Sequence, residues 1–142
     1  MNEDYVVDAS VAAKWFLVED GMAEADILSR SRSRLIAPSF VLVELGNIIW
    51  KQTLRGIFDG AEASQIMFNA RHYFEELIAE ADLLGMALDL ACTYRHSVYD
   101  CLCLALAMEH DCRLVTADRK LTELFSATPL AKHVVSLASF AE

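Results

Sequence analysis

Short apolar runs alternate with longer stretches of helical periodicity along the whole chain. The runs predict five strands: Tyr5–Val7, Leu35–Ala37, Leu77–Ala79, Arg113–Val115 and Val134–Leu137. Apolar positions spaced three and four apart predict seven helices: Val11–Leu17, Asp20–Ser29, Ser39–Leu54, Asp59–Glu80, Leu83–Tyr94, Val98–Glu109 and Arg119–Phe125. Ser39 is expected to cap the third helix and Gly56 to end it. The third strand overlaps the end of the fourth helix, so that segment has two competing predictions.

Strands separated by helical stretches imply parallel pairing through crossover connections. The predicted fold class is therefore α/β, with a parallel sheet that helices cover on both faces. A chain of 142 residues has the length of one domain, and we predict a single domain over residues 1–142. Ligands in such folds bind beyond the carboxyl ends of the strands, which is where we expect the chemistry.

Composition and charge narrow the function classes. Hydrophobic residues make up 55% of the chain, with two prolines and five glycines, which excludes a disordered or collagen-like chain. Twelve basic against 21 acidic residues give a net charge of −9, so overall charge disfavours binding to nucleic acid or anionic membrane. No uncharged apolar run reaches 18 residues, and the opening MNEDYVVD lacks the basic start of a signal peptide. We therefore expect a cytoplasmic protein without a membrane partner.

Several residue types carry no predicted chemistry. The four cysteines lack the spacing of a zinc site and are expected to be small buried thiols: Cys92, Cys101, Cys103 and Cys112. The four histidines show no ligand spacing and receive no role. Trp15 and Trp50 are expected to pack in the core or in a dimer contact rather than to stack on bases.

Two acids occupy the predicted carboxyl ends of strands. Asp8 follows the first strand, and Asp118 follows the fourth in LVTAD (114–118), so both are expected at one edge of the sheet. Each also has an alternative role as the N-cap of the helix that follows it. The hydroxyls of Ser10 and Thr116 flank these acids. They are candidates to hold a water or a phosphate, or they are cap and turn residues.

Two further acids lie in apolar surroundings. Glu44 is in SFVLVELGNIIW (39–50), a predicted buried helix in which an unpaired carboxylate would cost several kcal/mol. Asp100 is in HSVYDCLCLALAM (96–108), where it forms a Ser-x-x-Asp capping pattern with Ser97 or points from the helix start into a cleft. Carboxylates brought close together resist ionisation unless a divalent cation neutralises them. Ligands that offer only oxygen favour Mg²⁺ or Mn²⁺.

Four blocks carry a resemblance to a known family: VVDASVAAKWF (6–16), APSFVLVELGNIIWK (37–51), HSVYDCLCLALA (96–107) and RLVTADRKL (113–121). In order and spacing the chain resembles the PIN-domain nucleases, and most of all the VapC toxins of toxin–antitoxin pairs. The resemblance implies a three-layer α/β/α domain with a central parallel sheet of about five strands. It also implies Mg²⁺-dependent cleavage of RNA by four acids that match Asp8, Glu44, Asp100 and Asp118. In that family the acids matching Asp8 and Asp100 contact the metal directly, and the proteins form homodimers and are silenced by a VapB-like antitoxin.

Basic residues offer candidate RNA contacts. The segment SRSRSR (29–34) supplies Arg30, Arg32 and Arg34, which either contact RNA phosphates or face the negative end of a helix dipole. Arg119, directly after Asp118, either contacts RNA near the cleavage point or lies on a solvated face.

Other functions remain as alternatives. An RNA-processing nuclease outside a toxin–antitoxin pair would use the same residues, and a non-cleaving RNA-binding module would have no reason to hold Glu44 among apolar neighbours. A haloacid dehalogenase needs a second Asp two residues after the first, where this chain has Ser10. A receiver domain needs an acidic pair after the first strand and an Asp after the third, and neither is visible.

Overall fold

A five-stranded parallel sheet forms the centre of the protein. The computed structural model describes residues 3–141. The strands are β1 (Tyr5–Val7), β2 (Leu35–Pro38), β3 (Glu76–Ile78), β4 (Arg113–Thr116) and β5 (Val134–Ser136). They pair in the order β3-β2-β1-β4-β5, and every neighbouring pair is parallel. The predicted α/β class and the number of strands are confirmed.

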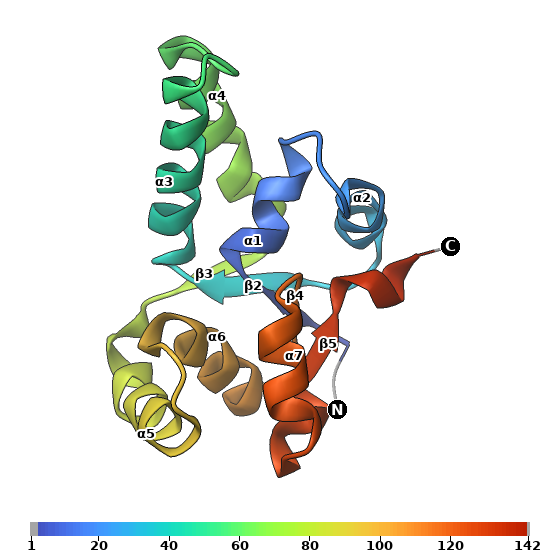
Figure 1. Cartoon of the computed structure of the whole chain (residues 1–142), viewed down its shortest axis with the longest axis vertical. Helices are drawn as coiled ribbons and strands as arrows, with labels where there is room; N and C mark the ends of the chain where they lie inside the picture. Colours follow the sequence, from blue (N-terminus) through green and yellow to red (C-terminus); the bar gives the residue numbers. More distant parts are fainter. Residues whose placement is uncertain (1–2, 142) are drawn as a thin grey trace.

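Helices cover both faces of the sheet (Figure 1). On one face lie α1 (Ala9–Ala12), α2 (Met22–Arg30), α3 (Val41–Leu54) and α4 (Gly60–Ala70). On the other lie α5 (Leu84–Tyr94), α6 (Val98–Glu109) and α7 (Arg119–Ser126). Short 3₁₀ segments complete the chain: Ala13–Trp15, Arg71–Tyr73, Glu80–Leu83, Pro129–His133 and Leu137–Phe140. Helices α3 and α4 pack together and project beyond the sheet as an arm (Figure 1).

The core lies on both faces of the sheet, and helix α6 is its most buried helix. This helix packs against β1, β2 and β4, and all of its residues from Cys101 to Ala107 are buried. The central strands contribute Val6, Val7 and Leu114, none of which is exposed to solvent. Each fully buried aliphatic side chain of this kind stabilises the fold by about 1.5–3 kcal/mol. The core thereby fixes the carboxyl ends of β1 and β4 relative to the start of α6.

The predicted helix Asp59–Glu80 is wrong in its second half. Helix α4 ends at Ala70, one 3₁₀ turn follows, and β3 begins at Glu76. The backbone N–H of Glu75 donates to the carbonyl of Leu35 at 2.8 Å, and β3 then pairs with β2. Pairing with the sheet edge therefore prevails over the helical periodicity of this segment.

The start of α3 differs from the prediction, whereas its end agrees with it. Phe40 occupies the N-cap position, and the hydroxyl of Ser39 instead donates to Glu80 Oε2 at 2.6 Å. At the other end Gly56 adopts a positive φ of 76°, and the N–H of Ile57 donates to the carbonyl of Gln52 at 2.9 Å. A left-handed residue just after a helix favours glycine, as the sequence predicted.

Helix α3 is not buried on all sides, contrary to the prediction from its apolar sequence. Val41, Leu45 and Ile49 are buried, but Val43 is 74% exposed and Trp50 is 54% exposed. Both side chains lie off the buried stripe of the helix, on sides that little else covers among residues 3–141.

Three smaller predictions have mixed outcomes. Trp15 stacks on Tyr73 with ring centroids 4.3 Å apart and donates to the carbonyl of Ala25, so it packs as expected, whereas Trp50 does not lie in the core. Cys92 is exposed, whereas the other three cysteines are buried, and all four are free thiols.

Between residues 3 and 141, no helix combines the length and the apolar character needed to span a membrane. The predicted domain of residues 1–142 includes three positions, Met1, Asn2 and Glu142, that lie outside the described residues.

Candidate functional site

The sheet has a topological switch point at β1, where successive strands stop being added on one side and are added on the other. From β1 the chain moves outward to β2 and β3, and then returns to place β4 on the other side of β1. The loops that leave β1 and β4 therefore diverge and open a crevice at the carboxyl edge of the sheet. Asp8 follows β1 and Asp118 follows β4, so both flank this crevice.

Asp8 acts both as a helix cap and as a wall of the crevice. Its Oδ1 accepts hydrogen bonds from the N–H of Val11 at 3.0 Å and from the hydroxyl of Ser10 at 2.6 Å. Burial raises the pKa of Asp8, and the negative charge of Asp100 raises it further. Hydrogen bonds from Ser10, Thr116 and Val11 act in the opposite direction. Both predicted hydroxyls thus contact the site.

Asp118 also combines the two roles that the sequence left open. Its Oδ1 caps helix α7 by accepting from the N–H groups of Lys120 at 2.9 Å and Leu121 at 3.4 Å. The hydroxyl of Thr116 accepts from the N–H of Asp118 at 3.1 Å, which fixes the turn between β4 and α7. Asp118 is nevertheless exposed, so its carboxylate stays accessible from the crevice.

Asp100 lies in the first turn of α6 and has a histidine partner. The hydroxyl of Ser97 caps the helix by accepting from the N–H of Asp100 at 3.3 Å. The side chain of Asp100 makes its shortest contact elsewhere, because Oδ2 lies 2.6 Å from Nε2 of His96. The predicted capping pattern is present, and it leaves the carboxylate at the crevice.

Glu44 approaches from α3 and completes the set. Burial raises its pKa to about 7, with further contributions from the negative charges of Asp100 and Asp8. The three carboxylates are therefore near enough to oppose one another's ionisation. The same charges reach Cys103 beneath the site and, together with burial, hold the pKa of its thiol well above the ordinary value.

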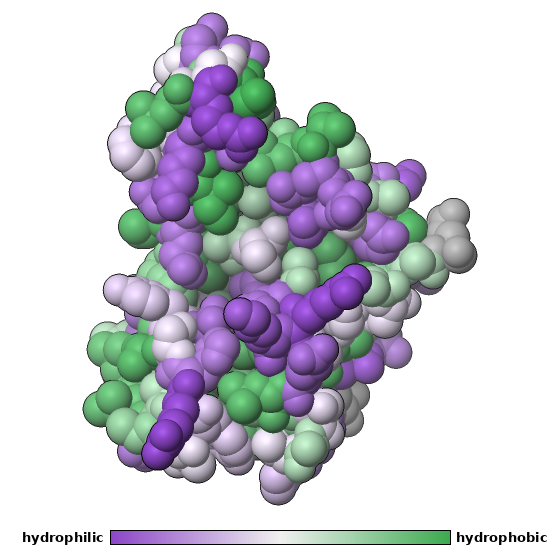
Figure 2. Space-filling model, viewed as in Figure 1, coloured by the Kyte–Doolittle hydropathy of each residue, from purple (hydrophilic) through white to green (hydrophobic). Residues whose placement is uncertain are grey.

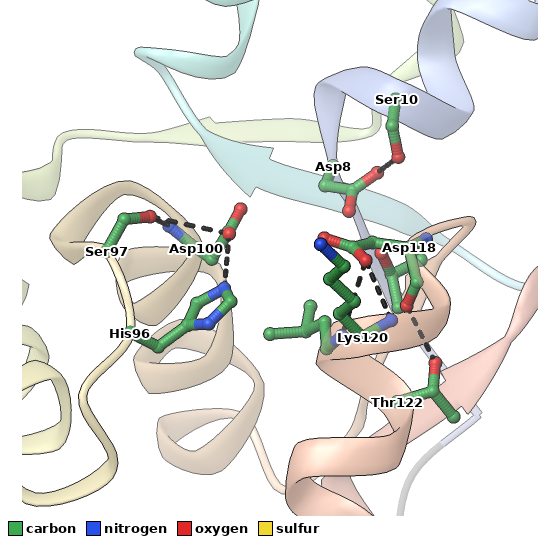
Figure 3. A network of polar contacts seen from close by, with 10 residues as sticks. Asp8, Ser10, His96, Ser97, Asp100, Asp118, Lys120 and Thr122 are labelled. Atoms are coloured by element: carbon green, nitrogen blue, oxygen red, sulfur yellow. Dashed lines mark hydrogen bonds and ion pairs between the residues drawn. The ribbon is translucent and has the colours of Figure 1, made fainter.

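All four acids line one open cleft of about 180 Å³, together with Ala9, Ser10 and Ile48. In Figure 3 the carboxylates of Asp8, Asp100 and Asp118 face a common space from three elements. Figure 2 shows hydrophilic side chains gathered over the middle of this face, beneath the arm of α3 and α4. Four acids that are distant in sequence thus meet at one place.

The donor atoms suit a hard divalent cation. One ligand atom from each of His96, Asp100 and Asp118 lies within 4.8 Å of the others. Asp8 is not a member of this group, but its carboxylate faces the same cleft. An oxygen-rich set with a single imidazole favours Mg²⁺ or Mn²⁺ over Zn²⁺, which prefers nitrogen and sulfur. Burial, and then the negative charges of Asp100 and Asp8, raise the pKa of Glu44, and a bound cation would counteract both effects.

His96 is a site residue that sequence reasoning missed. Its imidazole is mostly shielded and pairs with Asp100, four residues further on. The signal was present in the sequence as a His four positions before an acid at the start of a helix, HSVYD. It was overlooked because His96 precedes the helix, so that helical spacing did not apply to it.

The predicted arginine contacts fall in two different places. Arg30 pairs with Asp26 at 2.7 Å, and Arg34 lies 3.6 Å from Asp4 and 3.8 Å from Glu76. Arg34 directly precedes β2, so the segment with Arg30, Arg32 and Arg34 lies toward the amino edge of the sheet, opposite the acids. Contact between these three and RNA stays a prediction, separate from the cleft.

Arg119, by contrast, begins α7 directly after Asp118. It lines a neighbouring cavity of about 290 Å³ together with Lys14 and the end of β5. Of the four candidate arginines, it is the one beside the acids.

The raised pKa of Glu44 predicts how stability depends on pH. Because the folded protein holds this proton up to about pH 7 and the unfolded chain releases it near 4.5, Glu44 destabilises the fold progressively as pH rises between those values. In EDTA, we expect Glu44→Gln to be more stable than the wild type at pH 8, by about 1–2 kcal/mol. The gain is no larger because solvent screens this half-buried group. The difference should vanish near pH 4.5. Urea unfolding across this range measures it.

Glu62→Gln is the matched control for this series, since Glu62 is an exposed helical acid remote from the cleft that serves in the capping box of α4. Its effect should not follow the same pH window. A Glu44→Gln variant that is less stable than the wild type at pH 8 would contradict the assignment.

Comparisons with known proteins show the family and the fold. The family model of the PIN domain matches residues 5–125. The chain is 32% identical over 124 residues to Ribonuclease VapC3 of Pyrobaculum aerophilum, covering 86% of this chain and 95% of that protein. A crystal structure of a protein from Pyrobaculum aerophilum superposes with a TM-score of 0.73 at 24% identity, covering 96% of this chain and 85% of the other. A toxin–antitoxin complex from Klebsiella pneumoniae gives a TM-score of 0.69 at 18% identity, covering 94% of this chain and 98% of the other.

The two solved structures share the fold, and the family model together with the curated relative covers most of the chain. On that evidence the chain belongs to the PIN domain family.

Proposed function

We propose that this protein is an Mg²⁺- or Mn²⁺-dependent endoribonuclease and the toxin of a VapBC-type toxin–antitoxin pair. The observation that carries the proposal is the convergence of Asp8, Glu44, Asp100 and Asp118 on one cleft at the switch point of the sheet. Asp8 and Asp118 also cap helices, but burial of Glu44 and the negative charges of Asp100 and Asp8 oppose its ionisation, a cost that a bound cation would offset.

The residues that would hold the metal are Asp8 and Asp100, with Asp118 and Glu44 completing the shell directly or through water. Bound there, a divalent ion supplies charge neutralisation at the phosphodiester and lowers the pKa of an attacking water. Asp8 is kept in place by its hydrogen bonds from Ser10 and Val11. The contact with His96 orients Asp100, in the way that outer partners commonly orient metal ligands.

RNA is the substrate that we assign to the cleft. Support comes from the relative named Ribonuclease VapC3, which is 32% identical over most of this chain. Arg119 beside the acids would contact a substrate phosphate, because guanidinium binds phosphate in a fixed two-point geometry. The net charge of −9 means that this attraction is local and that metal must neutralise the cleft before RNA binds.

An antitoxin and a second copy of the chain are the proposed protein partners. Support for the antitoxin comes from the likeness of this fold to a chain solved in a toxin–antitoxin complex. An acidic cleft favours a partner segment that carries Arg or Lys. We further propose that the protein works as a homodimer in the cytoplasm.

Metal binding should be visible in stability. A ligand that binds only the folded state at 100 times its Kd stabilises it by about 2.7 kcal/mol, which corresponds to roughly 5–10 °C in Tm for a domain of this size. We expect Mn²⁺ or Mg²⁺ to raise the Tm of the wild type in this way. Asp8→Asn should show a clearly smaller shift in the same calorimetric scan. An unchanged wild-type Tm would count against a metal site in the cleft.

The proposed activity is tested most broadly by sequencing RNA ends after induced expression, with the wild type compared with Asp8→Asn. New ends that appear only with the wild type would support the ribonuclease, and identical end profiles would reject it. The toxin assignment needs growth arrest by the wild type and its relief by co-expression of a small protein encoded directly upstream. Harmless overexpression without such a neighbour would favour an RNA-processing nuclease instead.

A further inference from the structure

A second cavity adjoins the acidic cleft and differs from it in chemistry. It has a volume of about 420 Å³, within the usual range of ligand pockets. Its lining combines two aromatic rings, an amide and aliphatic side chains: Phe40, Val43, Glu44, Asn47, Ile48 and Tyr99. Glu44 and Ile48 line both cavities, so the two are direct neighbours.

The cavity lies along a second face of α3. Val41, Leu45 and Ile49 form the stripe that faces the core. A second stripe with helical spacing consists of the residues at 40, 43, 44, 47 and 48, and all of them line the new cavity. Val43 is 74% exposed on this stripe, so the cavity presents an apolar surface to solvent beside the acids.

The aromatic rings come from two helices that also carry the acids. Phe40 lies at the start of α3, four residues before Glu44, and Tyr99 directly precedes Asp100 on α6. Their ring centroids are 5.8 Å apart with an interplanar angle of 34°. Tyr99 is 62% exposed, so the aromatic surface is open beside the carboxylates.

We propose that this cavity is a base-binding subsite: a nucleobase adjoining the scissile phosphate stacks on Tyr99 and Phe40, while Asn47 contacts the edge of the base. This inference rests on the proposed ribonuclease activity and adds the residues that select the sequence cleaved. Single-stranded RNA is commonly read in this way, by stacking on aromatic rings and by hydrogen bonds to base edges.

The observations favour an RNA base over an apolar protein segment. A strand whose phosphate lies at the acids must place its neighbouring bases in adjoining space, and the cavity borders the cleft at Glu44 and Ile48. The exposed amide of Asn47 offers both a donor and an acceptor, which matches the edge of a base. An apolar peptide would leave that amide unpaired on burial, at a cost in affinity.

The test measures cleavage of a pool of random-sequence RNA 20-mers in Mn²⁺, with sequencing of the products and kinetics on the most frequent site. The variants Tyr99→Phe, Tyr99→Leu and Tyr99→Ala distinguish the contribution of the aromatic ring to RNA binding from that of its apolar surface area. We expect Tyr99→Phe to keep the base preference, whereas Tyr99→Leu and Tyr99→Ala flatten it and raise KM about tenfold, the size expected for one lost stacking contact. Asn47→Ala should change which base is preferred. The matched control is Phe68→Ala, which removes an equally exposed aromatic ring of α4 outside both cavities.

The outcomes separate this inference from the activity on which it rests. If the wild type does not cleave the pool, the proposed ribonuclease falls, and the subsite falls with it. If the wild type cleaves, but Tyr99→Leu and Tyr99→Ala keep its base preference and KM, the subsite alone is refuted. Unchanged RNA kinetics combined with weaker self-association in sedimentation would identify the cavity as a protein contact and overturn the proposal.

Discussion

Replacing Asp8 by Asn is expected to lower the rate of RNA cleavage by about 10³-fold or more while leaving the protein folded. Loss of metal-based charge stabilisation is worth several kcal/mol in the transition state, and about 4 kcal/mol corresponds to three orders of magnitude. The fold should persist because the Asn side-chain oxygen can still accept from Val11 and Ser10, as Asp8 Oδ1 does. Because burial raises the pKa of Asp8, removing its charge also relieves the folded state. Initial rates on the preferred RNA, together with a melting curve, measure both effects.

Asp59→Asn is the control for the capping role of Asp8. Asp59 caps α4 through its own Oδ1, which accepts from the N–H of Glu62 at 2.7 Å, but it lies on the surface outside the cleft. Its amide variant should cleave RNA at the wild-type rate. A folded Asp8→Asn variant with wild-type activity in Mg²⁺ would show that the proposed site is misplaced.

Replacing Phe125 by Ala is expected to reduce the free energy of unfolding by about 3–5 kcal/mol, the usual cost of deleting a buried aromatic ring. Phe125 is fully buried at the end of α7, and its ring meets that of Tyr94 edge-on at a centroid distance of 5.1 Å. It also lies 6.5 Å from the ring of His96, so the cavity left behind would loosen the support of Asp100. Urea unfolding in EDTA measures the loss without a contribution from bound metal.

Phe125→Leu should cost less than Phe125→Ala, because it leaves a smaller cavity. Phe68→Ala, which removes an exposed ring, should change the free energy of unfolding by no more than about 0.5 kcal/mol. A Phe125→Ala variant within 1 kcal/mol of the wild type would contradict the packing of α7 described above.

The four acids could be located from the sequence because each occupies a position where the local pattern does not predict a carboxylate or gives it a special place in the fold. Asp8 and Asp118 end apolar strands, and the rule for parallel sheets brings such ends together. Glu44 and Asp100 interrupt apolar helices, where a carboxylate needs a reason to be present. For Asp8 and Asp118, the alternative as helix caps was also correct, because one oxygen caps the helix while the carboxylate still borders the cleft.

Sequence patterns failed where the outcome depends on distant partners. Residues 71–80 have helical periodicity, and only pairing with β2 turns part of them into β3. The apolar sequence of α3 predicts burial all round, yet burial depends on what lies beside each face, and Val43 lies off the stripe that packs against the core. His96 was missed for a related reason, since its partnership with Asp100 arises from the turn before α6.

The structure shows where part of the net charge of −9 is located. Four of the acids form one cleft, so part of the excess charge is concentrated where a cation would neutralise it. Binding of RNA by overall charge should accordingly be weak, and metal should be a condition for substrate binding rather than an addition to it.

The metal dependence of RNA cleavage by the purified protein tests the central claim most directly. We expect metal-stripped wild type in EDTA to cleave no faster than Asp8→Asn, and Mn²⁺ or Mg²⁺ in excess of the chelator to restore the full rate. The products should carry no 2′,3′-cyclic phosphate if, as proposed, water rather than the 2′-hydroxyl attacks the phosphorus. Cleavage at the full rate in EDTA would contradict the account, because the four acids would then have no metal to hold.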